Sequence, residues 1–385
     1  MHICFITSEY PKIGFHHGGV GTFIQTLARN LVKNKFQVSI VGLNYSDKHE
    51  EEEDMGVKVY RLKPKRMKPI TWYLTFRSIN QQINKINRKQ PIDVVEATEL
   101  GLAFIKKIPS ISYIIRMNGG HHFFSESENR GIDPWKGFQE KRSFAQADVV
   151  IGVSNYVVNH TLTYLDFAKK KGPVLYNPAN LANFYEADPE KIIPGRLFFA
   201  GTVCEKKGIR QLIQALPLIR KEFPDAHLLV AGRDWFFPDG SSYIDYLKSN
   251  FVPDELSPYI TFLGPVDNQK LPAYIEEAEL CIYPSHMEAM PLAWIEVLSM
   301  GKSFLASNVG PGPEVVTDGV TGRLCDPYSP EDIAQKAIQM LANPEESRKF
   351  GQKAREDVLK RFDIKVLVEQ NIKFYQSLKK SPAHQ

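Results

Sequence analysis

Short apolar runs alternate with longer segments of helical periodicity along the first half of the chain. The runs ICFIT, QVSIVGL, DVVEA and YIIRM are typical of buried strands, and helical patterns at residues 22–34 and near 79–87 lie between them. Strands that alternate with helices form parallel sheets whose faces the helices cover. The first half therefore predicts a doubly wound α/β domain.

The same alternation begins again after residue 195. The runs RLFFAG, HLLVAG, YITFLG, LCIYP and SFLAS predict a second set of strands, with helices at 209–221, near 244–250 and at 291–300. A restart of this kind indicates a second domain of the same class rather than one larger sheet.

We therefore expect two Rossmann-like domains, at residues 1–183 and 184–365. Residues 366–385 are expected to form a C-terminal helix and tail that cross back to the first domain. Open sheets of this class bind ligands at the carboxyl ends of their strands. Two facing domains would form a cleft there, so the loops that follow the strands are the places to look for chemistry.

Composition narrows the class of protein. Hydrophobic residues make up 43% of the 385 positions and charged residues 24%, which is typical of a folded protein and excludes disorder. The four cysteines lie far apart without a C-x-x-C pair, which argues against a disulfide framework or a zinc cage. No apolar run approaches the roughly 18 residues of a membrane span, and the N-terminus lacks the pattern of a signal peptide. A cytoplasmic protein is expected, with contact at the inner face of the membrane left open.

The net charge of +4 is too small to predict nucleic-acid binding, but it is unevenly distributed. Residues 58–90 carry ten basic side chains and no acidic one, and Trp72, Tyr73 and Phe76 interrupt them. This stretch is either a surface for anionic lipid or an acidic acceptor, or a solvated helix whose aromatic rings face the core. The acidic run at 50–54 just before it is expected to be an exposed loop.

The loop after the first strand is rich in glycine. Gly18, Gly19 and Gly21 open the first helix, where free N–H groups attract phosphate and the absence of side chains lets a ligand approach the backbone. The G-x-G-x-x-G motif of nicotinamide-binding proteins is broken at Ile24. A ribose-binding Asp or Glu should follow the next strand, but the residues there, which end at Asn44, include no acid. A nicotinamide-dependent oxidoreductase is therefore disfavoured.

The loop after RLFFAG has the sequence GTVCEKKG. Lys206 or Lys207 could place an ammonium group beside a departing diphosphate, where positive charge lowers the barrier. Neither Ser nor Thr follows the lysines, so the loop is not a P-loop. A solvated lysine pair is the alternative.

The most specific segment is PSHMEAMPLAWIEVLSMG, residues 284–301. Pro291 suits a helix start and Gly301 the position just past its end, which places Glu288 in the preceding loop and Glu296 in the second turn. A carboxylate before a helix start can accept hydrogen bonds from hydroxyl groups, and Glu296 can take a vicinal diol. The spacing alone would also fit surface carboxylates.

The E-x7-E spacing, followed by VLSMGKSFLAS and GPGPEVVTDGVTGRLCDP, resembles the retaining glycosyltransferases of family 4, which have the GT-B fold. The resemblance extends over nearly the whole chain and is of the type found in bacterial polysaccharide assembly. It implies an N-terminal domain that binds the acceptor and a C-terminal domain that binds a nucleotide sugar.

The resemblance also implies roles for individual residues. Glu296 would bind the ribose, Glu288 a donor hydroxyl, and Lys207, with Lys206, the diphosphate. The remaining donor contacts would come from Gly19, Thr202, Pro265, Val266, Ala289, Met290 and Leu292. Glu99 and His122 would contact the acceptor.

Three positions depart from the family pattern. Thr202 stands where members commonly have Arg, so a diphosphate contact is missing or comes from Lys206 or Arg210. Pro291 removes one N–H donor beside the sugar. Asn118, followed by His121 and His122, stands where many members have a histidine near the reacting centre, and all three remain candidates, with a structural role open for either histidine.

The function that this resemblance implies is transfer of a sugar from a nucleotide diphosphate sugar to a glycan or lipid-linked acceptor, with retention of configuration. No cofactor or metal is expected, because no D-x-D follows a predicted strand and a lysine with helix N-termini can replace the cation. A sugar-nucleotide epimerase of the same fold and a nucleotide-binding protein without activity remain alternatives.

Overall fold

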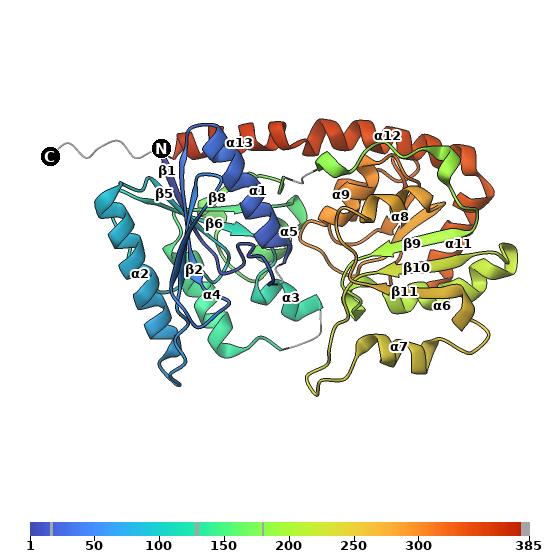
Figure 1. The fold of residues 1–385 in the computed structure, drawn as a ribbon, viewed down its shortest axis with the longest axis horizontal. Helices are drawn as coiled ribbons and strands as arrows, with labels where there is room; N and C mark the ends of the chain where they lie inside the picture. The colour runs from blue at the N-terminus through green and yellow to red at the C-terminus, as the bar shows by residue number, and fades with distance from the viewer. Residues whose placement is uncertain (16–17, 128–130, 179–180, 379–385) are drawn as a thin grey trace. The chain divides into compact units, whose positions relative to one another are not determined.

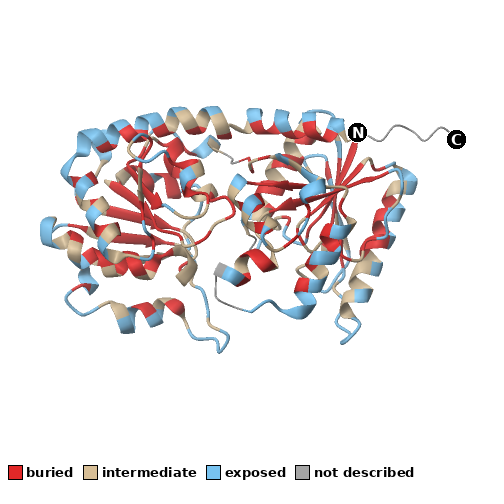
Figure 2. Cartoon of the chain, turned by 180° about the vertical axis from the view of Figure 1, so that it is seen from behind, coloured by how far each residue is buried: buried red, intermediate tan, exposed pale blue. Residues whose placement is uncertain are grey.

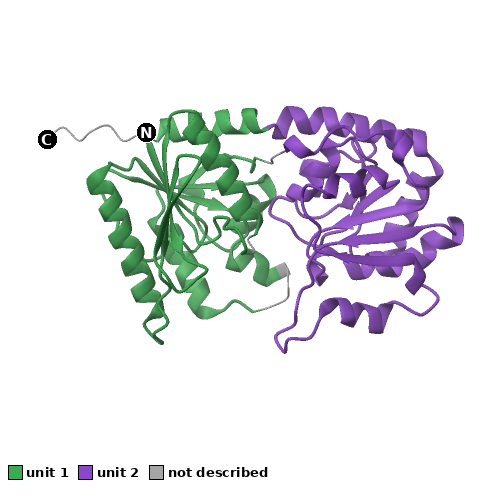
Figure 3. Ribbon diagram, in the orientation of Figure 1, with its two compact units in different colours: residues 1–179, 364–385 green, residues 180–363 purple. Residues whose placement is uncertain are grey.

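The computed structural model describes residues 1–15, 18–127, 131–178 and 181–378. Contacts divide the chain into two compact units, which are described separately (Figure 3). Unit 1 comprises Met1–Ala179 and Ile364–Gln385, and unit 2 comprises Asn180–Asp363. Part of the predicted C-terminal tail, residues 379–385, lies outside the described residues.

Unit 1 is built on an eight-stranded sheet of order β3-β4-β2-β1-β5-β6-β7-β8 (Figure 1). All neighbouring strands are parallel except β3 and β4. Its strands are β1 (His2–Ile6), β2 (Gln37–Leu43), β3 (Glu50–Asp54), β4 (Val57–Leu62), β5 (Val94–Ala97), β6 (Ser112–Met117), β7 (Val149–Gly152) and β8 (Lys171–Val174). Its α-helices are α1 (Gly19–Lys33), α2 (Thr71–Lys89), α3 (His121–Ser127), α4 (Pro134–Gln146), α5 (Asn155–Leu162) and α13 (Ile364–Ser377).

Unit 2 contains a six-stranded, fully parallel sheet of order β11-β10-β9-β12-β13-β14. The strands are β9 (Arg196–Ala200), β10 (His227–Ala231), β11 (Ile260–Gly264), β12 (Leu280–Tyr283), β13 (Phe304–Ser307) and β14 (Arg323–Cys325). The helices are α6 (Ile209–Glu222), α7 (Tyr243–Phe251), α8 (Leu271–Glu277), α9 (Leu292–Ser299), α10 (Gly312–Val315), α11 (Pro330–Ala342) and α12 (Pro344–Phe362). This order is the 3-2-1-4-5-6 arrangement of Rossmann sheets.

Strand order reverses once in each sheet, between β1 and β5 in unit 1 and between β9 and β12 in unit 2. From the ends of the two strands at such a point, the chain continues toward opposite sides of the sheet. In open sheets this arrangement forms the ligand site at the carboxyl ends of the two strands. The predicted glycine-rich and Glu-containing loops follow these four strands. In each sheet, the loops with predicted functional residues therefore lie at the point where the strand order reverses.

Apolar residues of the central strands form the cores. Those strands are buried on both faces (Figure 2), which explains why their sequences are continuous apolar runs rather than alternating ones. Phe5 and Leu27 belong to the core of unit 1, and Phe199 and Leu216 to that of unit 2. The predicted α/β fold is confirmed.

The prediction that residues 50–54 form an exposed loop is wrong. They form β3, an antiparallel edge strand that pairs with β4. The strand is tolerated because cations neutralise its carboxylates: Arg61 pairs with Glu52, and Arg29 with Asp54. Charge on an edge strand also discourages pairing with other chains.

Helix α13 is fixed to unit 1 by a buried polar network. Arg116 of β6 donates to Glu96 of β5 at 2.8 Å and to Asn371 of α13 at 2.6 Å, and the hydroxyl of Tyr375 donates to Glu96 at 2.7 Å. These side chains are almost fully buried, so each depends on the others for its hydrogen bonds. No helix among the described residues is both long and apolar enough to span a membrane.

Candidate active site

The loops after β9 and β12 pack backbone against backbone at the switch point of unit 2. The amide of His286 donates to the carbonyl of Lys206 at 2.9 Å. Gly208 has a φ of +70°, and a Cβ there would lie 1.8 Å from the carbonyl oxygen of Pro284. Glycine at 208 is therefore required both by backbone conformation and by the close approach of the two loops.

Lys207 and Glu288, predicted from separate segments, meet at this point. Lys207 ends a 3₁₀ turn at Glu205–Lys207, and its ammonium donates to the Glu288 carboxylate. Both side chains are largely but not completely buried. The structure thus places a cation and an anion side by side at the rim of the β9–β12 crevice.

Helix α9 carries the second predicted carboxylate. It begins at Leu292, one residue later than expected, with Pro291 in an extended conformation as its N-cap. Gly301, just past the end, has a φ of +74°, as its predicted position requires. Buried Trp294, Ile295 and Leu298 anchor the helix in unit 2.

Glu296 has the most unusual environment in this region. Burial raises the pKa of its carboxyl group to about 7. Its carboxylate forms no hydrogen bond or ion pair with any residue that the structure describes, and it raises the pKa of the buried Tyr283 hydroxyl nearby. The side chain is only half-buried, so its oxygens stay accessible to an incoming ligand. It is therefore suited to receive hydroxyl donors from a ligand.

Arg210, one of the candidates to replace the missing arginine at 202, is already engaged. Its guanidinium binds Glu205 through Nε at 3.0 Å and through a terminal nitrogen at 2.6 Å. Burial opposes ionisation of Glu205, but hydrogen bonds from Arg210, Tyr243 and Gln211 lower its pKa to about 2. Arg210 therefore holds the Glu205–Lys207 turn in place.

Arg233 was missed by the sequence analysis. It follows β10, the neighbour of β9, and its Nε donates to the hydroxyl of Thr202 at 3.3 Å. The side chain is exposed and pairs with no carboxylate among the described residues. A basic residue directly after a strand-ending glycine, as in VAGR, is the signal that could have found it.

The other predicted donor residues lie as follows. Ala289 and Met290 are buried in the loop before α9, and Leu292 opens that helix. Pro265 and Val266 follow β11, whose last residue, Gly264, accepts a hydrogen bond from Gly232 of the neighbouring loop at 2.8 Å. Gly19 belongs to unit 1, where it is the first residue of α1.

The predicted acceptor residues of unit 1 gather at its own switch point. Glu99 follows β5 and accepts a hydrogen bond from the amide of Asn118, which follows β6, at 2.5 Å. Burial, assisted by the charge of Glu140, raises the pKa of Glu99 to about 8. The Asn118 side chain accepts a hydrogen bond from Asn177 at 2.9 Å. Burial therefore favours the protonated form of the Glu99 carboxyl group near neutral pH.

His121 and His122 open α3 and are held by Glu140 of α4. The carboxylate accepts hydrogen bonds from both backbone amides at 2.9 Å and contacts Nδ1 of His122. His122 is almost fully buried, whereas Nε2 of His121 accepts from the amide of Asp133 at 2.8 Å. Glu140 was also missed, although an acid on the inward face of an amphipathic segment could have indicated it.

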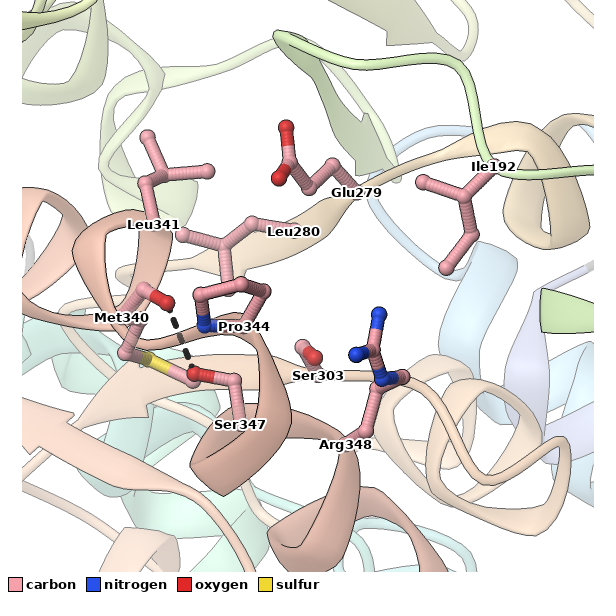
Figure 4. A pocket seen from close by; sticks show the side chains of 9 residues that line it. All are labelled: Ile192, Glu279, Leu280, Ser303, Met340, Leu341, Pro344, Ser347 and Arg348. Atoms are coloured by element: carbon pink, nitrogen blue, oxygen red, sulfur yellow. Dashed lines mark hydrogen bonds between the residues drawn. The ribbon is translucent and has the colours of Figure 1, made fainter. Parts of the chain in front are cut away.

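No metal site stands out in the described part of the chain. No three His, Cys, Asp or Glu side chains there are arranged to bind a metal ion. One cavity, at the amino ends of β12 and β13, is lined by Glu279, Ser303 and Arg348 among others (Figure 4). Its volume of about 30 Å³ suits a water molecule rather than a nucleotide.

Comparisons with known proteins match both units. The Glycosyltransferase Family 4 model matches residues 17–183, and the Glycosyl transferases group 1 model matches residues 189–357. An uncharacterized glycosyltransferase of Methanocaldococcus jannaschii is 25% identical, over 97% of this chain and 98% of its own. N-acetyl-alpha-D-glucosaminyl L-malate synthase of Bacillus anthracis is 27% identical over 62% of each chain.

Solved structures show the same fold over the full chain. Sucrose-phosphate synthase from Thermosynechococcus elongatus superposes with a TM-score of 0.82 at 20% identity, covering 98% of both chains. Anabaena HepE in complex with UDP and glucose gives a TM-score of 0.77 at 16% identity, covering 98% of this chain and 100% of its own.

Proposed function

Because the chain belongs to the family 4 glycosyltransferases of GT-B type, we propose that it transfers a sugar from a nucleotide diphosphate sugar to an acceptor hydroxyl with retention of anomeric configuration. The acceptor is a glycan or a lipid-linked sugar of cell-surface polysaccharide assembly. HepE, a structural neighbour, was crystallised with UDP and glucose, which supports a nucleotide sugar as the donor.

The observation that carries this proposal is the environment of Glu296. A carboxylate with a pKa near 7 and no partner among the described residues lies on α9, the helix that follows the Lys207–Glu288 ion pair. In the proposed complex, Glu296 accepts hydrogen bonds from the two ribose hydroxyls and Glu288 from a sugar hydroxyl. Ala289, Met290 and Leu292 contact the sugar and phosphate by their backbone.

Lys207 would then turn from Glu288 toward the diphosphate. The bond between the anomeric carbon and the diphosphate oxygen breaks, and the acceptor oxygen bonds to the same face of that carbon. The acceptor proton passes to the departing diphosphate oxygen, so no protein nucleophile is needed. Positive charge near that oxygen stabilises the transition state, which is the role proposed for Lys207 in place of a metal ion.

Residues of unit 1 are proposed to position the acceptor. Glu99, protonated at neutral pH, can donate a hydrogen bond to an acceptor oxygen, and Asn118 lies directly beside it. His121 is only partly buried, which supports a contact with substrate. His122 is buried against Glu140, which supports a positioning role.

The diphosphate is proposed to have a second cationic contact, from Arg233. Thr202 leaves a charge missing at the end of β9, and Arg233 reaches that position from the adjacent strand, where it touches the Thr202 hydroxyl. Since Arg210 is bound to Glu205, Arg233 is better placed than Arg210 to serve the diphosphate.

Calorimetric titration of UDP, GDP and ADP into the protein tests the donor site. We expect one nucleotide to bind selectively, and Glu296→Ala to weaken its binding by about tenfold or more, because a hydrogen bond to a charged group contributes roughly 1.5 to 3 kcal/mol. Affinity should rise between pH 6 and 8 as Glu296 ionises, with release of a proton on binding.

Glu296→Gln is the matched control for this pH dependence. The terminal phosphate of the nucleotide also titrates, with a pKa near 6, but it does so with both proteins. Only the wild-type protein should therefore show the additional rise in nucleotide affinity between pH 6 and 8. Equal affinity of wild type and Glu296→Ala for every nucleotide would contradict the assignment.

A further inference from the structure

Aromatic side chains from three parts of unit 1 gather on its surface. The ring centroid of Trp72, on α2, lies 4.5 Å from that of Phe104, which belongs to the loop after β5. It lies 5.3 Å from the ring centroid of Trp135 on α4. Phe76 lies 5.3 Å from Phe104, and Phe138 lies 5.7 Å from Trp135. We call these five residues the aromatic patch.

None of the five rings is buried. Trp135 is 42% exposed and Phe138 is 50% exposed, and the neighbouring Tyr73 is also half exposed. The buried face of α2 is formed instead by Ile79, Ile83 and Ile86, farther along the helix. Trp72, Tyr73 and Phe76 therefore do not belong to the buried face of α2. Trp72, Phe76 and Phe104 are half-buried, and together with exposed Trp135 and Phe138 they form an apolar surface of the kind that marks an interaction site.

The patch is held in one arrangement by the fold. Asn80, a buried residue of α2, donates to the carbonyl of Phe104 at 3.0 Å and accepts from the amide of Lys106 at 2.8 Å. The guanidinium of Arg142 lies 5.2 Å from the centre of the Phe104 ring. The loop that presents Phe104 is thus fixed to both flanking helices.

Positive charge outweighs negative charge beside the patch, where Asp133, the N-cap of α4, is an exposed acid. The basic side chains are Lys65, Arg66, Lys68 and Arg77 beside α2, and Lys136, Lys141 and Arg142 on α4. None of them forms an ion pair with a described residue. Residues 65–77 contain no acid, and Glu140, the acid of α4, is buried beneath α3.

Part of the remaining basic stretch is neutralised by the acidic edge of the sheet, whereas Lys58, Arg88 and Lys89 form no ion pair with a described residue. Arg61 is buried and pairs with Glu52, and Lys85 pairs with Glu51 at 3.3 Å. Unpaired cations of residues 58–90 thus lie next to the aromatic patch, at Lys65, Arg66, Lys68 and Arg77, and also at the far end of α2, at Arg88 and Lys89.

We propose that the aromatic patch and its basic rim bind the surface of an anionic membrane. Tryptophan is enriched at the interface of lipid headgroups and hydrocarbon, and nearby Lys and Arg are attracted to anionic headgroups. Trp135 is stacked on both Phe104 and Phe138, with interplanar angles of 22° and 27°. Their faces are largely used in these contacts, which favours insertion of ring edges into lipid over stacking on nucleic-acid bases. This inference does not depend on the proposed activity.

Sedimentation with lipid vesicles tests the proposal. The full-length protein should sediment with vesicles containing phosphatidylglycerol but not with phosphatidylcholine alone, and less at high salt. Two variants should lower the partition coefficient by more than about tenfold: Trp135→Ser with Phe138→Ser, and Lys65→Ser with Arg66→Ser and Lys68→Ser.

The matched control removes three exposed lysines of α12, with Lys349→Ser, Lys353→Ser and Lys360→Ser, and should keep wild-type binding. Trp135→Phe should also keep it, while quenching of tryptophan fluorescence by brominated lipid should fall. That second measurement is independent of any loss of folding in the serine variants.

Three results would overturn the proposal. These are no sedimentation of the wild-type protein with anionic vesicles, a loss of binding in the α12 variant as large as in the patch variants, and binding of polyuridylic acid to the patch in preference to vesicles. The last result would assign the surface to nucleic acid.

Discussion

At the scale of single residues, the proposed donor chemistry depends on a few side chains whose surroundings differ from those of ordinary surface groups. Glu296 is a carboxylate without partners among the described residues, and Lys207 and Glu288 form an ion pair at the same strand ends. The positions of Lys207 and Glu288 in loops and of Glu296 on the following helix could be predicted from the sequence, because helix signals and E-x7-E spacing are local. Their contact could not be predicted, since residues 207 and 288 are far apart in the chain.

Arg233 illustrates the same limit. The sequence showed that a positive charge was missing at Thr202, but only the pairing of β9 with β10 places Arg233 beside it. The candidates drawn from local sequence were Lys206 and Arg210, and Arg210 proves to be bound to Glu205. Proximity along the chain was a poor guide to proximity in the sheet.

Moving the positive charge from position 233 to position 202 tests the role of Arg233. Arg233→Gln should weaken binding of a nucleoside diphosphate by about tenfold, with a smaller effect on the monophosphate, because a charge-assisted contact to the second phosphate is lost. Adding Thr202→Arg to this variant should restore much of the affinity. Calorimetric titration measures all three proteins.

Arg348→Gln is the matched control for that exchange. It removes the same charge from helix α12, beside the cavity of Figure 4 at the amino ends of β12 and β13, and should leave affinity unchanged. An equal loss for mono- and diphosphate in Arg233→Gln, or no recovery with Thr202→Arg, would count against the role.

At the scale of elements, prediction was reliable where hydrophobic periodicity was strong. The expected helix at 209–221 is α6 at Ile209–Glu222, and the expected strands of the second half correspond to β9 to β13. The acidic run at 50–54 was mispredicted because strand propensity is low for Glu, whereas the observed strand is stabilised by cations from other elements.

Helix α13 depends on polar contacts that periodicity cannot reveal. Tyr375→Phe should lower the free energy of unfolding by about 1.5 to 3 kcal/mol, since the hydroxyl donates to the buried, charged Glu96. Urea denaturation followed by circular dichroism measures the change. Tyr73→Phe, which removes an exposed hydroxyl from the same unit, should have almost no effect, and equal stability of the two variants would contradict the role of the network.

At the scale of the whole molecule, the two units repeat one plan: a parallel sheet with a single switch point and functional candidates in the loops beside it. The units differ in what they present there. Unit 2 offers Lys207, Arg233 and unpartnered Glu296, which suit an anionic nucleotide, whereas unit 1 offers a protonated Glu99 and Asn118, which suit neutral hydroxyls. Net charge alone, at +4, conceals this division and the basic rim of the aromatic patch.

The central claim is transfer of a sugar with retention of configuration, and proton NMR of donor cleavage tests it most directly. With water as acceptor, the protein should release a free sugar that first appears as the anomer present in the donor, before mutarotation. Lys207→Gln should slow this release by about 100-fold or more, because a charge at the leaving group is removed, while Lys221→Gln, an exposed lysine of α6, should not. Initial appearance of the opposite anomer, an epimerised sugar, or no cleavage of any UDP, GDP or ADP sugar would contradict the account.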